Sequence, residues 1–208
     1  MGQQDLEAVA EVLRGTDIIV ISDEIYAELT YGQHHVSIAN IPDMYERTVF
    51  VGGFSKSHAM TGWRMGYACG PADIIVQMLK IHQYAVMSSP TTSQYAAIRA
   101  MRDGDEDIQN MKREYDQRRR HLYSGLHDIG LECFEPMGAF YMFPSIKSTG
   151  LTSTEFCEQF LLQEKVAVIP GSAFGQGGEG FVRICYASSM EKISIALEKM
   201  EKFVKSLQ

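Results

Sequence analysis

Residues 52–67 read Gly52-Gly-Phe-Ser-Lys-Ser-His-Ala-Met-Thr-Gly-Trp-Arg-Met-Gly-Tyr67. This stretch places Lys56 between two serine hydroxyls and sets Arg64 further along the same segment. The apolar run at 47–51 leads into it, which predicts a buried strand that ends just before the lysine. A lysine that follows a buried strand is well placed to have a desolvated amine, and Schiff-base chemistry requires an amine of that kind.

The composition is that of an ordinary globular protein, with 208 residues, 45% hydrophobic residues and 22% charged residues. A net charge of −7 argues against nucleic acid and against anionic membranes as partners. The four cysteines are widely spaced and the six histidines show no zinc-protease spacing, so we expect no disulfide framework and no metal site. The polar N-terminus is unlike a signal peptide and no apolar run is of membrane-spanning length, which predicts a cytoplasmic protein.

The sequence predicts an α/β fold for the first part of the chain and a smaller α+β unit for the second part. In the first part, helices are predicted at 3–14, 72–86, 90–103 and 105–129, and buried strands at 17–22, 48–52 and 65–69. In the second part, strands are predicted near 131–134, 139–143, 166–169 and 180–186, and helices at 153–164 and 190–206. We expect domains at 1–107 and 108–208, and we interpret the arginines at 118–120 as a solvated helix face.

Asp23 and Tyr26 come directly after the first predicted strand, and ligands of open α/β sheets bind outside the carboxyl ends of the strands. Taken alone, the pair is more simply a turn cap and a half-buried tyrosine. Lys56, taken alone, is more simply an ordinary loop lysine. All these residues, together with Ser55 and Arg64, follow adjacent strands, and this clustering favours a phosphorylated aldehyde cofactor whose phosphate Arg64 holds.

Arg183 lies in an otherwise apolar strand, Phe181-Val-Arg-Ile-Cys-Tyr186. Because an unpaired buried guanidinium is costly, an anion must meet it. That anion is either an internal carboxylate or the carboxylate of a substrate, and the segment favours neither.

These segments resemble those of the class I/II aminotransferases, which are pyridoxal-phosphate enzymes of the aspartate aminotransferase fold, fold type I. Ser55-Lys56 followed by Met60-Thr-Gly-Trp-Arg64 is similar to the lysine signature of that family. The segments 22–26 and 181–187 match family segments in order and spacing. The similarity is greatest to a PatA-like bacterial subgroup that acts on aspartate, aromatic amino acids or N-acetyl-diaminopimelate.

The resemblance implies transfer of an amino group between such an amino acid and a 2-oxo acid, with pyridoxal 5'-phosphate as cofactor and a homodimer as the assembly. It implies that Lys56 is the catalytic residue, which forms the Schiff base and then moves the proton between Cα and the cofactor's C4′. It also implies that Arg183 binds the substrate α-carboxylate.

The resemblance assigns the remaining cofactor contacts to four residues of the first part. Asp23 would keep the pyridine nitrogen protonated, and Tyr26 would bond the phenolic oxygen. Ser55 and Arg64 would hold the phosphate.

The similarity is to the C-terminal portion of the family only. The Asn-Pro-x-Gly segment, the phosphate turn and the ring-stacking aromatic of the family are not found in these residues. About three strands are predicted for the cofactor sheet, where mean sheets have about five to six, so an apolar edge is expected to be exposed. The sequence therefore predicts a fragment or a mis-called reading frame in which Met1 is an internal methionine, and it leaves open an inactive fragment or a related pyridoxal-phosphate lyase.

Overall fold

The structure is a computed structural model that describes residues 1–207. The chain forms two compact units, Met1–Lys112 and Arg113–Gln208. The division between them falls inside the long helix α5 (Asp105–Asp128), and the domain boundary predicted at residue 107 lies in the same helix.

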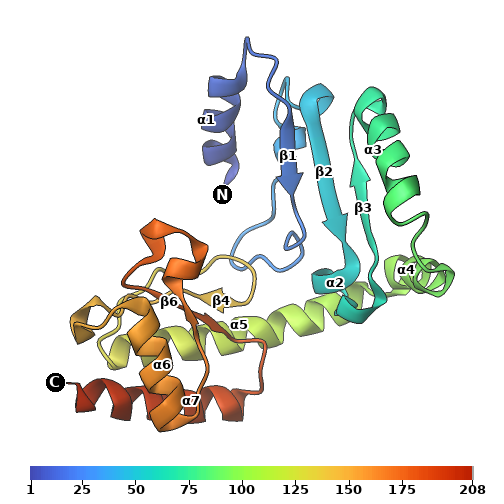
Figure 1. Cartoon of the computed structure of the whole chain (residues 1–208). Helices are drawn as coiled ribbons and strands as arrows, with labels where there is room; N and C mark the ends of the chain where they lie inside the picture. The colour runs from blue at the N-terminus through green and yellow to red at the C-terminus, as the bar shows by residue number, and fades with distance from the viewer. Residues whose placement is uncertain (208) are drawn as a thin grey trace. The chain divides into compact units, whose positions relative to one another are not determined.

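The first unit is built on a three-stranded sheet in the order β1-β2-β3 (Figure 1). In chain order its elements are α1 (Gln3–Leu13), β1 (Val20–Asp23), the 3₁₀ turns at Ile38–Asn40 and Tyr45–Arg47, β2 (Thr48–Gly53), α2 (Phe54–Ser57), the 3₁₀ turn at Thr61–Trp63, β3 (Gly66–Cys69), α3 (Ala72–Ala85) and α4 (Thr91–Asp103). β1 pairs with β2 in parallel and β3 pairs with β2 antiparallel.

β1 lies at one edge of this sheet, and its outward side chains are open. Ile21 is 75% exposed and Ile18, just before the strand, is 55% exposed. The prediction of a fully buried strand at 17–22 is therefore wrong, because the strand has a neighbour on one side only and begins at Val20. The exposed apolar edge expected from the small number of strands is present.

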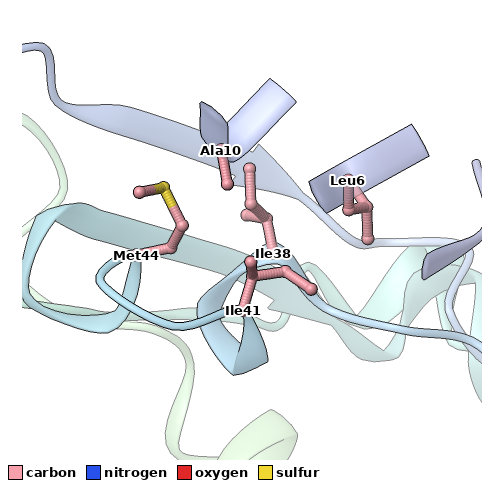
Figure 2. Close-up of a cluster of buried hydrophobic side chains, with 5 residues drawn as sticks. All are labelled: Leu6, Ala10, Ile38, Ile41 and Met44. Carbon is pink, nitrogen blue, oxygen red and sulfur yellow. The ribbon is translucent and has the colours of Figure 1, made fainter. Parts of the chain in front are cut away.

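Helix α1 packs through two positions one turn apart (Figure 2). Leu6 and Ala10 share one face at i, i+4 spacing and contact Ile38, Ile41 and Met44. All five side chains are buried and form a small core of their own. This core fixes the segment between β1 and β2.

The second unit holds a three-stranded antiparallel sheet in the order β4-β6-β5. Its elements after α5 are β4 (Tyr141–Met142), a 3₁₀ turn at Lys147–Thr149, α6 (Ser153–Glu164), β5 (Ile169–Pro170), 3₁₀ turns at Gly171–Phe174 and Gln176–Gly178, β6 (Val182–Cys185) and α7 (Met190–Ser206). The core contains an aromatic cluster in which the ring of Phe203 lies 5.2 Å from Phe156 and 5.3 Å from Phe160, between centroids.

The strand predicted at 131–134 is wrong, because these residues are irregular. The amide of Leu131 donates to the carbonyl of Leu126 and so closes helix α5. The carbonyl of Glu132 accepts one hydrogen bond from the amide of Ser145, and a single hydrogen bond does not pair two strands. Phe134 is 94% exposed. The apolar residues here terminate a helix rather than extend a sheet.

The interpretation of residues 118–120 as a solvated face is wrong for Arg119, which is 5% exposed. Its guanidinium pairs with Asp116 at 2.7 Å and with Glu135 at 2.5 Å. Burial alone would raise the pKa of Asp116, but hydrogen bonds from Arg119 and Arg120 lower that pKa on balance. The ion pair between Arg119 and Glu135 ties α5 to the irregular segment that follows it.

Helix α6 begins with a capping box that yields a test of local stability. Thr152 Oγ1 accepts from the amide of Glu155, and Glu155 Oε2 accepts from the amide of Thr152 at 2.9 Å. We expect Thr152→Ala to lower the free energy of unfolding by about 1 kcal/mol, measured by urea titration. Thr154→Ala, an exposed position within the same turn, is the control. An equal loss in both variants would contradict the capping role.

Candidate functional site

The predicted site residues of the first unit follow the carboxyl ends of two parallel strands. Asp23 is the last residue of β1 and pairs with Val51 of β2. β2 ends at Gly53, and α2 follows at once, carrying Ser55 and Lys56. Because β1 and β2 run in the same direction, Asp23 and Lys56 lie at the same end of the sheet, the carboxyl end of the two strands.

The segment that carries Lys56 is held by buried neighbours on both sides. Phe54 and Met60 are buried and pack with Ala97 of α4. Ser93, also on α4, donates its hydroxyl to the carbonyl of Trp63 at 2.6 Å. Helix α4 therefore fixes the segment, while Lys56 itself is half-buried.

Arg64 ends the turn that follows, in an exposed position. Its backbone is left-handed, with φ 52° and ψ 49°. Its Nη1 donates to the carbonyl of Thr61 at 3.0 Å, and the next carbonyl, that of Met65, accepts from the amide of Phe54 at 3.2 Å. The chain thus returns to the start of α2, which keeps Arg64 and Lys56 on one compact turn.

Asp23 and Tyr26 lie in the turns directly after β1. Asp23 is exposed, and its Oδ1 accepts from the amide of Ile25 at 3.2 Å, which is the turn cap considered as the simpler alternative. Among residues 1–207, no partner contacts its second carboxylate oxygen. Tyr26 is half-buried, and its carbonyl accepts from the amide of Leu29. The cap leaves one oxygen of Asp23 available for a ligand.

Glu24 was missed by the sequence reasoning, and it positions the end of β1. It is 8% exposed and accepts from the hydroxyls of Ser22 at 3.0 Å and Ser37 at 2.5 Å. His35 pairs with its other carboxylate oxygen. A buried carboxylate needs such partners, and two of them, His35 and Ser37, come from a distant loop that no local pattern predicts. The network ties that loop to the residue beside Asp23.

A cavity of about 380 Å³ opens at the same end of this unit. Its lining includes Glu24, Phe50, Phe54, Ser57, Tyr67 and Asp105. Burial raises the pKa of Tyr67, and the neighbouring Cys69 and Glu28 raise that pKa further. None of the predicted site residues lines the cavity, so the cavity and the predicted cofactor site are formed by different residues.

Arg183 lies in the second unit, on β6, and is half-buried. Its guanidinium carbon stands 4.5 Å from the ring centroid of Tyr141 and 4.5 Å from that of Phe174. Within the part of the chain that the structure describes, no carboxylate forms an ion pair with it, so the internal-carboxylate alternative is not observed. Two aromatic faces hold the arginine and leave its charge uncompensated.

Over residues 1–207, no group of three or more His, Cys, Asp or Glu side chains is placed to hold a metal ion. No helix within the same range is long and apolar enough to cross a membrane.

Residues 2–200 match the family described as aminotransferase class I and II. The chain belongs to that family. The match covers both units and includes every predicted site residue. The resemblance inferred from Ser55-Lys56 and Arg64 is thereby confirmed, as is its implication for the cofactor, because aminotransferases of this family use pyridoxal 5'-phosphate.

Among curated aminotransferases, the chain is 50% identical over 202 residues to the putative aminotransferase YugH of Bacillus subtilis, covering 97% of this chain and 52% of that protein. It is 48% identical over 206 residues to an aspartate aminotransferase of Pyrococcus abyssi, covering 98% of this chain and 53% of that protein. This chain thus spans about half the length of the curated relatives it matches.

Solved structures of aminotransferases confirm the fold class. An aromatic aminotransferase from Pyrococcus horikoshii superposes with a TM-score of 0.96 at 45% identity, over 99% of this chain and 56% of that one. An aspartate aminotransferase double mutant of Thermus thermophilus gives 0.90 at 35% identity, over 97% of this chain and 52% of that one. The chain therefore has part of the aspartate aminotransferase fold, fold type I, as predicted.

Proposed function

We propose that this chain is the lysine-bearing portion of a pyridoxal-phosphate aminotransferase, which transfers an amino group between an amino acid and a 2-oxo acid. The observation that carries the proposal is the placement of Lys56. It is half-buried, it follows directly on β2, and it lies with Asp23 at the carboxyl end of two parallel strands. An aldehyde cofactor requires a partly desolvated amine for its carbonyl, and a carboxylate at the same end of the sheet can serve its ring nitrogen.

The side chains that follow the carboxyl ends of β1 and β2 fit the chemical groups of pyridoxal 5'-phosphate. The cofactor presents an aldehyde, a phosphate dianion, a phenolic oxygen and a ring nitrogen. Lys56 supplies an amine, Arg64 and Ser55 supply donors for the phosphate, and Tyr26 supplies a phenol. Asp23 offers the carboxylate oxygen that its turn does not use. When bound, the cofactor supplies an electron sink for the carbanion formed at the substrate Cα.

The chain's own residues would then bind, orient and move protons. Asp23 would keep a proton on the ring nitrogen, and Tyr26 would donate to the phenolic oxygen. Lys56 Nζ would attach the cofactor and carry the proton that leaves and returns at Cα. The anchoring of Phe54 and Met60 on α4 holds that amine in place.

Arg183 would bind the α-carboxylate of the substrate. The rings of Tyr141 and Phe174 hold its guanidinium in place and exclude water from its faces. A held guanidinium accepts a carboxylate through two parallel hydrogen bonds, which fixes the direction of the Cα–H bond. The uncompensated charge of Arg183 supports this role over an internal ion pair.

The finer assignments follow from the relatives. We propose aspartate, aromatic amino acids or N-acetyl-diaminopimelate as amino donors, because relatives are named for each of these substrates. Residues 1–107 would be a partial cofactor-binding domain and residues 108–208 the small domain. A homodimer and a reducing cytoplasmic location complete the proposal, and the four free thiols support that location.

A second candidate is a non-catalytic fragment that binds the cofactor weakly or not at all. The exposure of Ile21 on the open edge of β1 favours it, since this edge lacks the cover that a closed site needs. A related lyase with the same lysine chemistry remains the alternative within the enzymes.

Product analysis separates these candidates. We expect a visible absorption band when pyridoxal phosphate is added, and glutamate when an amino donor and 2-oxoglutarate follow. Pyruvate and ammonia in place of glutamate would identify a lyase. An unchanged visible spectrum would identify the non-catalytic fragment and overturn the proposal for this chain.

A further inference from the structure

The carboxylate of Glu24 lies on the covered side of β1, opposite to that of Asp23. Side chains along a strand point to alternate faces, and in β1 Asp23 is exposed whereas Ser22 is half-buried. Glu24 continues this alternation on the covered side, where it is buried, and its amide donates to the carbonyl of Val51 at 2.8 Å. Two consecutive carboxylates therefore face opposite sides of one strand end.

Every polar group of Glu24 has a partner within the first unit. Oε1 accepts from the hydroxyls of Ser22 and Ser37, and Oε2 pairs with His35 Nε2. The backbone carbonyl accepts from the amide of Ala27 at 2.9 Å. These partners hold the carboxylate in one place, because losing any of them weakens the compensation of a buried charge.

The same residue closes the turn that carries two of the residues assigned to the cofactor. The hydrogen bond from Ala27 to the carbonyl of Glu24 spans Ile25 and Tyr26. Asp23 Oδ1 accepts from the amide of Ile25 within that turn. Because these residues share one hydrogen-bonded turn, a shift of Glu24 moves Asp23 and Tyr26 together.

The other end of the network is anchored in a buried core. Ser37 Oγ donates to Glu24 and accepts from the amide of Ala39 at 3.2 Å, since a hydroxyl can do both. Ile38, which lies between Ser37 and Ala39, is buried in the core that Figure 2 shows. The carboxylate of Glu24 thus connects the turn after β1 to a packed part of the same unit.

We propose that Glu24 is a positioning residue, which holds Asp23 and Tyr26 at the cofactor by anchoring their turn to the loop at 35–37. This inference rests on the proposed function, since it concerns the residues assigned there to the ring nitrogen and the phenolic oxygen. The alternative is a role in stability alone. The two roles differ in what the loss of the carboxylate does to bound pyridoxal phosphate.

Displacement of Asp23 and Tyr26 has a definite spectroscopic sign. A proton on the ring nitrogen and a donor at the phenolic oxygen both draw electron density from the nitrogen that joins Lys56 to the cofactor. Their loss makes that nitrogen hold its proton more tightly, so the visible band titrates at a higher pH. Removal of a nearby negative charge has the opposite effect, because a negative charge favours the protonated cation. An upward shift therefore reports displacement rather than the lost charge.

The test is a pH titration of the visible band after pyridoxal phosphate is added to the full chain. Glu24→Gln keeps the size of the side chain and removes its ion pair with His35. We expect the midpoint of its band to lie about 0.5–1 pH unit above that of the wild type, as the loss of a hydrogen bond implies. Ser37→Ala breaks the network from the loop side and is expected to shift the midpoint in the same direction, so it decides the question if Glu24→Gln does not fold.

Glu28→Gln is the matched control, because it makes the same chemical change at an exposed position of the same segment. Its midpoint is expected not to rise. A loss of stability to urea in Glu24→Gln with an unshifted midpoint, or an equal rise in Glu28→Gln, would overturn the inference and leave the proposed function in place. A wild-type chain without a visible band would overturn the proposed function, and this inference with it.

Discussion

Lys56→Ala is expected to abolish the attachment of pyridoxal phosphate to this chain after borohydride reduction. The reason is that Lys56 is the amine at the shared carboxyl end of β1 and β2, so its removal takes away the amine that we propose to bind the aldehyde. The measurement is peptide mapping of the reduced adduct, together with the visible absorption band of the unreduced protein. We expect the wild-type label on the peptide that contains Lys56 and its loss to background in the variant.

Lys80→Ala is the matched control, because Lys80 lies exposed on α3, where it bonds Gln77. Its label is expected to equal that of the wild type. Circular dichroism checks that Lys56→Ala is folded, which we expect because Phe54 and Met60 anchor the segment independently of the lysine. A label on another lysine, with the absorption band intact in Lys56→Ala, would refute the assignment.

Phe203→Ala is expected to cause the largest loss of stability, about 3–5 kcal/mol in the free energy of unfolding. Phe203 is fully buried and contacts both Phe156 and Phe160, so truncation leaves a cavity between α6 and α7. Urea unfolding followed by circular dichroism measures the loss. Because the chain has two compact units, the transition of the second unit is the one that is expected to shift.

Phe134→Ala is the control for that experiment. It removes the same side chain from a position that is 94% exposed, and surface changes of this kind stay within about 0.5 kcal/mol. A loss below about 1 kcal/mol in Phe203→Ala would show that the aromatic cluster is not the main core of the second unit.

Local patterns predicted the helices well because the signals for them are local. The helices at 153–164 and 190–206 were predicted with the bounds that the structure has, since Thr152 and Ser189 cap them and apolar spacing marks their length. The strand at 131–134 was wrong because Leu131 satisfies helix α5 instead. The burial of Arg119 was missed because its partner Glu135 lies beyond the helix.

The same contrast between local signals and distant partners applies to the candidate site. Asp23 and Lys56 were located by strand ends, and strand ends are visible as the limits of apolar runs. The loop partners of Glu24 and the aromatic faces around Arg183 come from residues distant in sequence, so a single sequence gives no sign of them. Their placement depends on the tertiary fold.

The left-handed backbone of Arg64 bears on why an arginine occupies that position at all. A residue with a Cβ pays about 1–2 kcal/mol to hold this conformation, whereas glycine adopts it freely. On backbone grounds alone, position 64 suits glycine. The single hydrogen bond from its guanidinium to the carbonyl of Thr61 is exposed and offsets little of this conformational penalty. Ala59 and Lys165 hold the same left-handed conformation, so these torsion angles do not by themselves require a ligand. A phosphate bound by Arg64, as proposed above, would offset their cost.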